Sequence, residues 1–262
     1  MPSPLSPSCI ALDKNSGELV GEDGSGASEN ALHAAWSSLT YGKINKKEIL
    51  IWGGTDGFCY GYENKTVKDA DGYDLFEPLW KVDCNEPNYR KDKEGKKIPY
   101  ATPPGPSELI GTPVLYEGKV YCAIGQDPEH GDGVGRLSCI DVKDGKVLWK
   151  YTDVGRTIST VSVADDLVYL AEYSGIIHCL DAHSGKVYWT HDSFSRIWGS
   201  TLVVDGKLIL GNEDGDLLIM DHGKSKPKVE TIDMGAPVYS SPVVANGTLY
   251  IGTQTHLYAI GK

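Results

Sequence analysis

Apolar and polar positions alternate in short runs along the chain, and the same arrangement returns about every 40 residues. In each unit, two apolar stretches flank a turn, as in VSVADDLVYLAE from Val161 and LVVDGKLILGN from Leu202. A second phrase, CIDVKDGKVLW at 139–149, returns as CLDAHSGKVYW at 179–189. A period of this length is typical of solenoids, propellers and other repeat architectures.

One unit contains four short runs rich in Val, Ile, Leu and Tyr, each bounded by turn residues. These runs predict strands at 158–164, 167–172, 176–181 and 186–191, with no room for helices between them. Four-stranded sheets repeated radially form a β-propeller. A β-helix would need much shorter coils, and a sandwich would not keep a 40-residue register. We therefore predict an all-β protein, a β-propeller of four-stranded antiparallel blades, with residues 1–262 forming a single domain.

The number of blades depends on how the two ends are interpreted. Units begin near Ala35, Ile110, Thr157, Ile197 and Val238, which gives five blades. The last unit ends on its third strand, whereas 9–13 and 18–21 match the third and fourth strands of a further unit. Either these N-terminal strands close a ring of five or possibly six blades, or the chain is a fragment with an open ring. An open ring exposes a strand edge, which favours dimerisation or aggregation.

An apolar strand, a glycine turn and then Leu-Asp-x-x-x-Gly-Lys-Val-x-Trp resembles the pyrroloquinoline-quinone-like (PQQ-like) repeat. The resemblance extends from about Ser8 to the end of the chain. In that family the tryptophan closing each unit docks against the neighbouring blade. The residues that match this position are Trp80, Trp149 and Trp189. Because Gly21 and Val229 stand where this tryptophan is expected, we expect weaker blade contacts there.

Composition narrows the classes of partner. The net charge of −11 and a pI near 5.1 argue against nucleic acid and anionic lipid as partners, because the field of the protein repels both. No apolar run reaches the roughly 18–20 residues of a membrane span. The first residues lack the basic and apolar regions of a signal peptide, although the family that the chain resembles is mostly periplasmic or extracellular. The six cysteines are expected to be buried thiols rather than disulfides.

Three long segments, 22–34, 83–109 and 126–135, are predicted on one face of the propeller, and the turns of the other face are mostly tight. Loops carry binding and catalytic residues more often than the strands that position them. This asymmetry indicates which face carries function, without indicating a reaction.

The segment 126–135 reads QDPEHGDGVG and contains three carboxylates and an imidazole, from Asp127, Glu129, His130 and Asp132. Such side chains could hold a calcium ion, or a zinc ion through the histidine. In the alternative interpretation, the same Asp and Gly residues only set turns in a polar loop.

Arg156 and Arg196 precede the inner strands of consecutive blades, and aromatic side chains hold comparable positions. Guanidiniums and indoles that converge on a channel mouth could bind an anionic or aromatic ligand. Alternatively, the arginines pair with acids such as Asp153 and Asp192, and the indoles fill the channel wall. The candidate ligand-binding residues are His33, Trp36, Arg156, Arg196 and Trp198.

The leading hypothesis is a non-catalytic PQQ-like scaffold that presents its loop-rich face to a protein or a small-molecule ligand, with no cofactor. In the quinone-dependent dehydrogenases of the family, the cofactor lies under a ring of two adjacent cysteines, with calcium and a catalytic aspartate. The sequence has no adjacent cysteines, so pyrroloquinoline quinone and a quinone-dependent oxidoreductase are disfavoured.

The alternative hypothesis is a metal-dependent hydrolase that cleaves esters, lactones or phosphotriesters at the channel mouth. Propeller hydrolases hold calcium there through carboxylate and amide oxygens, so a calcium or zinc ion would polarise the ester and its attacking water. The candidate ligands for this role are Asp127, Glu129, Asn212, Glu213 and Asp214.

Overall fold

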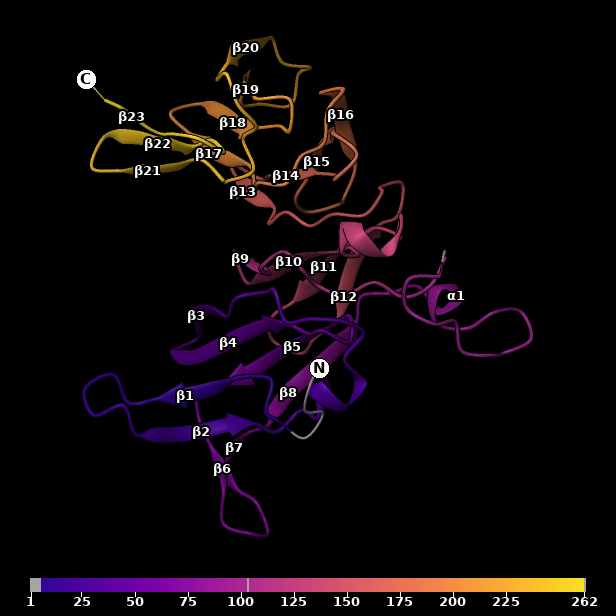
Figure 1. The fold of residues 1–262 in the computed structure, drawn as a ribbon. Helices are drawn as coiled ribbons and strands as arrows, with labels where there is room; N and C mark the ends of the chain where they lie inside the picture. Colours follow the sequence, from indigo (N-terminus) through magenta and orange to yellow (C-terminus); the bar gives the residue numbers. More distant parts are fainter. Residues whose placement is uncertain (1–5, 103, 262) are drawn as a thin grey trace.

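The computed structural model describes residues 6–102 and 104–261, and in this part of the chain six β-sheets follow one another along an open arc (Figure 1). The short helical turns are η1 (Ala27–Asn30), α1 (Pro87–Arg90) and η2 (Pro128–His130). The prediction of an all-β propeller with four-stranded antiparallel blades is confirmed. Among the described residues, no helix has the length and apolar character needed to span a membrane.

Four blades are complete, and in each the first strand is innermost. Blade 1 contains β3 (Thr40–Ile44), β4 (Lys47–Gly53), β5 (Phe58–Glu63) and β8 (Pro78–Asp83). Blade 2 contains β9 (Val114–Tyr116), β10 (Lys119–Ile124), β11 (Arg136–Asp141) and β12 (Val147–Tyr151). Blade 3 contains β13 (Ser162–Ala164), β14 (Leu167–Ala171), β15 (Ile176–Asp181) and β16 (Val187–Asp192). Blade 4 contains β17 (Leu202–Val204), β18 (Lys207–Gly211), β19 (Asp216–Asp221) and β20 (Val229–Asp233).

The two ends of the arc are incomplete sheets. The C-terminal sheet has three strands, β21 (Val243–Ala245), β22 (Thr248–Gly252) and β23 (Leu257–Ile260). The N-terminal sheet joins β1 (Ile10–Leu12) and β2 (Leu19–Asp23) to β7 (Asp74–Phe76) and β6 (Val67–Lys68).

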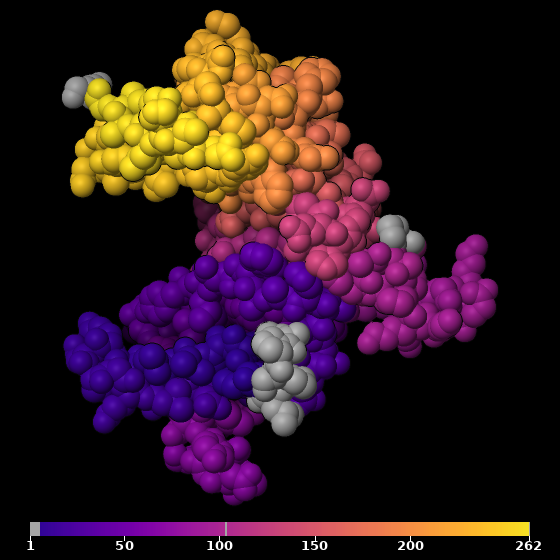
Figure 2. All heavy atoms as spheres, in the orientation of Figure 1, coloured from indigo at the N-terminus to yellow at the C-terminus, as the bar shows by residue number. Residues whose placement is uncertain are grey.

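The strand donation considered from the sequence, in which N-terminal strands complete the last blade, is not formed between described residues. Strand β23 pairs only with β22, and β2 lies between β1 and β7, so it has no free edge to offer. Figure 2 shows the indigo N-terminal and yellow C-terminal ends of the arc apart on its open side. Dimerisation through the free edges of β1 and β23 stays a prediction.

An indole of the outer strand joins each of blades 1, 2 and 3 to the next blade, as the resemblance predicts, and blade 4 has Val229 at this position. Trp80 and Trp189 are buried, and Trp149 is partly buried. The Nε1 of Trp80 donates to the Val142 carbonyl at 2.9 Å, and the Nε1 of Trp149 donates to the Ala182 carbonyl at 3.1 Å. Trp189 makes the same contact with Gly223 at 2.9 Å. These contacts combine the burial of a large apolar ring with the hydrogen bond that the indole N–H requires.

The N-terminal junction differs from this pattern. A Cβ added at Gly21 would lie 2.6 Å from Thr66 Cγ2 and 2.9 Å from Phe76 Cε2. Phe76 is buried and packs with Trp52 and Tyr62, and its strand β7 pairs in parallel with β2. The excursion between β5 and β8 therefore supplies an aromatic ring where this unit lacks its tryptophan. That this junction is weaker than those with a tryptophan stays a prediction.

A second set of contacts runs along the inner side of the arc. A backbone N–H of each blade donates to a hydroxyl of the next blade: Ser38 to Thr112 at 3.2 Å, Thr112 to Thr160 at 2.9 Å, Thr160 to Ser200 at 2.9 Å, and Ser200 to Ser241 at 2.8 Å. We call these five residues the hydroxyl belt. The belt fixes the register of neighbouring blades at the channel wall.

The described cysteines are free thiols, and all except Cys9 are buried. Cys84 and Cys122 lie in the core between blades 1 and 2, with 3.6 Å between their sulfur atoms. Hydrogen bonds between thiols and burial hold the pKa of both groups well above the ordinary value. These thiols therefore behave as small core side chains.

The indole contact generates a stability prediction at two glycines of blade 2 that share the same backbone conformation. Gly118 and Gly145 both have φ 74°, but a Cβ at Gly145 would lie 2.8 Å from Trp80, whereas a Cβ at Gly118 meets nothing within 4 Å. Gly118→Ala should cost only the backbone strain, about 1–2 kcal/mol. Gly145→Ala should cost a further ~1–3 kcal/mol, because the methyl group pushes the indole away.

The free energy of unfolding of the two variants in guanidinium chloride measures this difference directly. Equal destabilisation by the two substitutions would mean that the Trp80 contact does not hold blades 1 and 2 together.

Candidate functional site

The three long loops converge on one cluster of side chains. His33 comes from the loop 22–34, Tyr100 from 83–109, and Asp127 and His130 from 126–135. The rings of His33 and Tyr100 stack with their centroids 5.8 Å apart, and those of His33 and His130 lie 4.4 Å apart. Loops that are far apart in the sequence thus form one site.

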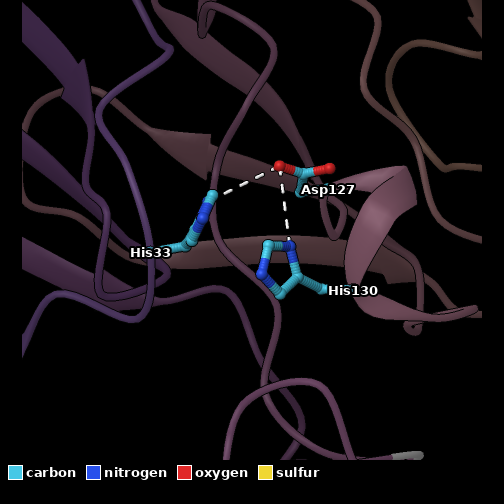
Figure 3. Close-up of side chains that lie close together, drawn as sticks. All are labelled: His33, Asp127 and His130. Atoms are coloured by element: carbon cyan, nitrogen blue, oxygen red, sulfur yellow. Dashed lines mark ion pairs between the residues drawn. The ribbon is translucent and has the colours of Figure 1, made fainter.

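Both histidines direct Nδ1 toward the same carboxylate oxygen (Figure 3). The Oδ2 atom of Asp127 lies 3.6 Å from Nδ1 of His33 and 3.7 Å from Nδ1 of His130. These separations exceed a normal hydrogen bond, and both Nδ1 atoms are buried without a hydrogen-bond partner. The arrangement leaves three potential metal ligands around a common point.

Local backbone structure positions the carboxylate and His130. Asp127 is the N-cap of η2, and its Oδ1 accepts the N–H of Glu129 at 2.8 Å, which leaves Oδ2 free. Gln126 donates its side-chain amide to the His130 carbonyl. The turn ends at Gly131, whose φ of 101° favours glycine.

Glu108 lies behind this cluster and is fully buried. Burial, together with the negative charge of Asp127, raises its pKa to about 8. The Tyr100 hydroxyl donates to Glu108 Oε1 at 3.4 Å, while Oε2 has no partner. The carboxyl group is therefore largely protonated at neutral pH.

The other acids of the loop 126–135 do not join the cluster. Glu129 lines the pocket described below, and the charge of Asp132 acts on Arg156. Among residues 6–102 and 104–261, the two groups of at least three potential ligand side chains within 4.8 Å of one another are His33–Asp127–His130 and Glu117–Asp166–His183.

The structure also separates Asn212, Glu213 and Asp214 from the cluster. The Oδ1 of Asn212 accepts the N–H of Asp216 at 2.8 Å, so this amide holds a turn. Glu213 pairs with Arg196, with 3.7 Å between Oε2 and Nη1. The backbone N–H of Asp214 donates to Ser195 Oγ. These three residues have local structural partners and form no shared ligand set with Asp127.

A pocket of about 370 Å³ lies beside the cluster, at the inner side of the blades. Its apolar wall contains Trp36, Ile110, Ile158 and Trp198. Each of these residues stands two positions before a hydroxyl of the belt, so successive blades contribute one side chain each. Asp127, Pro128 and Glu129 complete the lining. Both indoles predicted at the channel mouth therefore border one pocket, and two carboxylates border it with them.

The two predicted arginines share an aromatic ring that the sequence analysis missed. The guanidinium carbons of Arg156 and Arg196 lie 4.4 and 5.5 Å from the centroid of Tyr173. Arg156 also donates to the Gly131 carbonyl, so its polar partner is a backbone group and not the expected Asp153. Arg196 likewise pairs with Glu213 rather than Asp192. Ligand binding by the two arginines stays a prediction.

Trp198 lies edge-on between Tyr173 and Tyr239, with ring centroids 5.1 and 5.7 Å away. Tyr239 also stands two positions before a belt hydroxyl, so alignment on the hydroxyls would have identified it from the sequence. Tyr173 does not stand two positions before a belt hydroxyl, so the same alignment would not have identified it from the sequence.

The comparisons with known proteins agree on architecture. A PQQ-like family model described as outer membrane protein assembly factor BamB matches residues 77–261. The crystal structure of BamB from Moraxella catarrhalis superposes with a TM-score of 0.68 at 14% identity, covering 95% of this chain and 65% of that one. This chain therefore spans less than two thirds of the length of that BamB chain.

A computationally designed protein, Ika8, superposes with a TM-score of 0.59 at 13% identity, covering 97% of this chain and 71% of that one. At these identities, both structures support the fold alone. No curated protein matches the sequence.

The buried Glu108 generates a pH prediction. Its pKa rises from the ordinary 4.5 to about 8 on folding, so the folded state retains a proton that the unfolded state loses above pH 4.5. The free energy of unfolding should therefore fall as pH rises toward 8, relative to Glu108→Gln. The relative loss between pH 5 and 8 should be roughly 3–4 kcal/mol, at about 1.4 kcal/mol per pH unit.

Urea unfolding of both proteins at several pH values tests this, with Glu129→Gln as a control from the adjacent loop. Parallel stability profiles for wild type and Glu108→Gln would contradict a raised pKa at Glu108.

Proposed function

Because this chain belongs to the PQQ-like propeller family described by the BamB model, we propose that it is a binding propeller whose inner pocket receives a segment of a partner protein. The family supports the general role of a scaffold or binding protein. Our proposal adds two points to this general role: the pocket is the binding site, and its ligand is a protein segment.

The observation that carries the proposal is the pocket wall built from Trp36, Ile110, Ile158 and Trp198. The side chain of Trp36 is 55% exposed, although it lines the same pocket as the apolar residues Ile110 and Ile158. Concave apolar surfaces with a few polar groups are the usual form of a ligand site. An exposed tryptophan in such a site is typical of residues that dominate binding energy.

Charge indicates the kind of segment that fits. The acidic side chains at the pocket are Asp127 and Glu129, and the whole chain carries a net charge of −11. The nearby Arg156 and Arg196 contact Gly131, Tyr173 and Glu213, and neither arginine lines the pocket. Apolar or aromatic side chains beside lysine or arginine would complement this surface. We therefore favour a basic, apolar segment over the anionic ligand considered from the sequence.

A second candidate function is metal-dependent hydrolysis of esters, lactones or phosphotriesters. It is favoured only by the proximity of the His33–Asp127–His130 cluster to the pocket, because Asp127 belongs to both. An ion at the cluster would supply a Lewis acid at the pocket edge. Turnover of an ester, lactone and phosphotriester panel by zinc-loaded protein, and its loss in His130→Gln, is the result expected of a hydrolase.

The binding proposal predicts which peptides the protein selects. A random peptide library displayed on phage would be selected on wild-type protein and, in parallel, on the double variant Trp36→Ala/Trp198→Ala. We expect wild type to enrich sequences with aromatic or aliphatic residues beside Lys or Arg. Their affinity for the double variant should fall at least about tenfold, measured by fluorescence anisotropy of labelled peptides.

Phe194→Ala is the matched control, because Phe194 is 89% exposed but does not line the pocket. This variant should bind the selected peptides as wild type does. Equal binding by the double variant, or enrichment of acidic peptides, would refute the proposed site.

A further inference from the structure

We propose that His33, Asp127 and His130 bind one transition-metal ion of the zinc class where the three long loops meet (Figure 3). This inference is independent of the peptide-binding proposal. It differs from the ligand set expected from the sequence, because His33 enters the site and Glu129 and Asp132 do not.

The donor atoms select the kind of metal. Two imidazole nitrogens and one carboxylate oxygen suit zinc and neighbouring first-row ions. Calcium takes six to eight oxygen ligands, as a rule, and at this cluster the side chains supply one free carboxylate oxygen. Of the two metals considered from the sequence, the geometry therefore favours zinc.

The separations also fit a zinc ion. Ligand bonds of about 2.0–2.1 Å in a tetrahedral arrangement place donor atoms roughly 3.3–3.4 Å apart. The carboxylate oxygen of Asp127 lies 3.6 Å from His33 Nδ1 and 3.7 Å from His130 Nδ1. The ligand atoms of the three residues all lie within 4.8 Å of one another, so rotations of the two imidazole rings would bring them to these separations. Three protein ligands leave the fourth tetrahedral position for water or a ligand atom.

The unpartnered atoms give an independent reason for an ion. The Nδ1 atoms of His33 and His130 are buried and have no hydrogen-bond partner. Burying a polar atom without a hydrogen-bond partner destabilises the folded protein. Because Oδ1 of Asp127 already caps η2, its Oδ2 can serve as a ligand without disturbing the turn. One cation would satisfy all three atoms at once.

The second cluster of potential ligands is a weaker site. Its members, Glu117, Asp166 and His183, include a single imidazole, and His183 Nε2 already bonds to Asp166 Oδ1 at 2.9 Å. Both of these side chains are about half exposed, so water satisfies them. This cluster provides the matched comparison for the experiment.

The experiment uses full-length protein stripped of metal with a chelator. Zinc is titrated in competition with a chromophoric chelator, and cobalt is added separately to observe the visible absorption typical of tetrahedral coordination. We expect one zinc ion per chain at micromolar or lower free zinc, with no competition from calcium. His33→Gln and His130→Gln should each weaken zinc binding at least about 100-fold.

The matched controls are Asp132→Asn in the same loop and His183→Gln in the second cluster, and both should retain wild-type affinity. Zinc should also raise the melting temperature of wild type and of both controls, but not of the two cluster variants. Melting curves without zinc verify that each variant is folded.

Two results would overturn the proposal: absence of zinc binding at micromolar concentrations, or binding that survives His33→Gln and His130→Gln. Either result would leave the peptide selection unaffected, because the Trp36 and Trp198 variants test a different set of contacts.

Discussion

Contact between neighbouring blades is the constraint on which the rest of the molecule depends. Each of the first three complete blades is tied to the next by an indole of its outer strand, as at Trp80 and Val142. On the inner side, a hydroxyl receives a backbone N–H, as at Thr160 and Ser200. A four-stranded sheet alone buries little apolar surface, so its stability comes largely from these nearest-neighbour interfaces. Together they hold the strands that carry the pocket and the loops.

The functional surfaces follow from this framework in two different ways. The pocket arises from the repeat itself, because the residues two positions before four of the five belt hydroxyls line it. The His33–Asp127–His130 cluster instead arises from insertions, which depart from the repeat and meet over blades 1 and 2. Regular positions thus supply an apolar wall, and irregular loops supply polar and ionisable groups beside it. Asp127 belongs to both surfaces.

The period of the sequence predicted the propeller and its four-stranded blades, and the resemblance to the PQQ-like repeat predicted the docking of the closing tryptophans. The sequence did not predict contacts between insertions, because loop lengths rather than register decide where His33 meets His130. Asn212 and Glu213 illustrate the same limit. The amide of Asn212 and the carboxylate of Glu213 suggested metal ligands, but in the structure they contact Asp216 and Arg196. The packing role of Phe76 was missed because this residue lies in the excursion between β5 and β8 of blade 1, whereas the tryptophan that it replaces is missing from the N-terminal sheet, at Gly21.

The hydroxyl belt also gives the arc a direction. Every described link runs from an amide of one blade to a hydroxyl of the following blade, never in reverse. Each blade therefore has a donating side and a receiving side, and these are not interchangeable. Any further blade, whether from the same chain or another, would have to dock head to tail. Head-to-tail interfaces of this kind add blades in a ring or a helical array. A dimer with two-fold symmetry must use a different surface, because its interface joins the same patch on both chains.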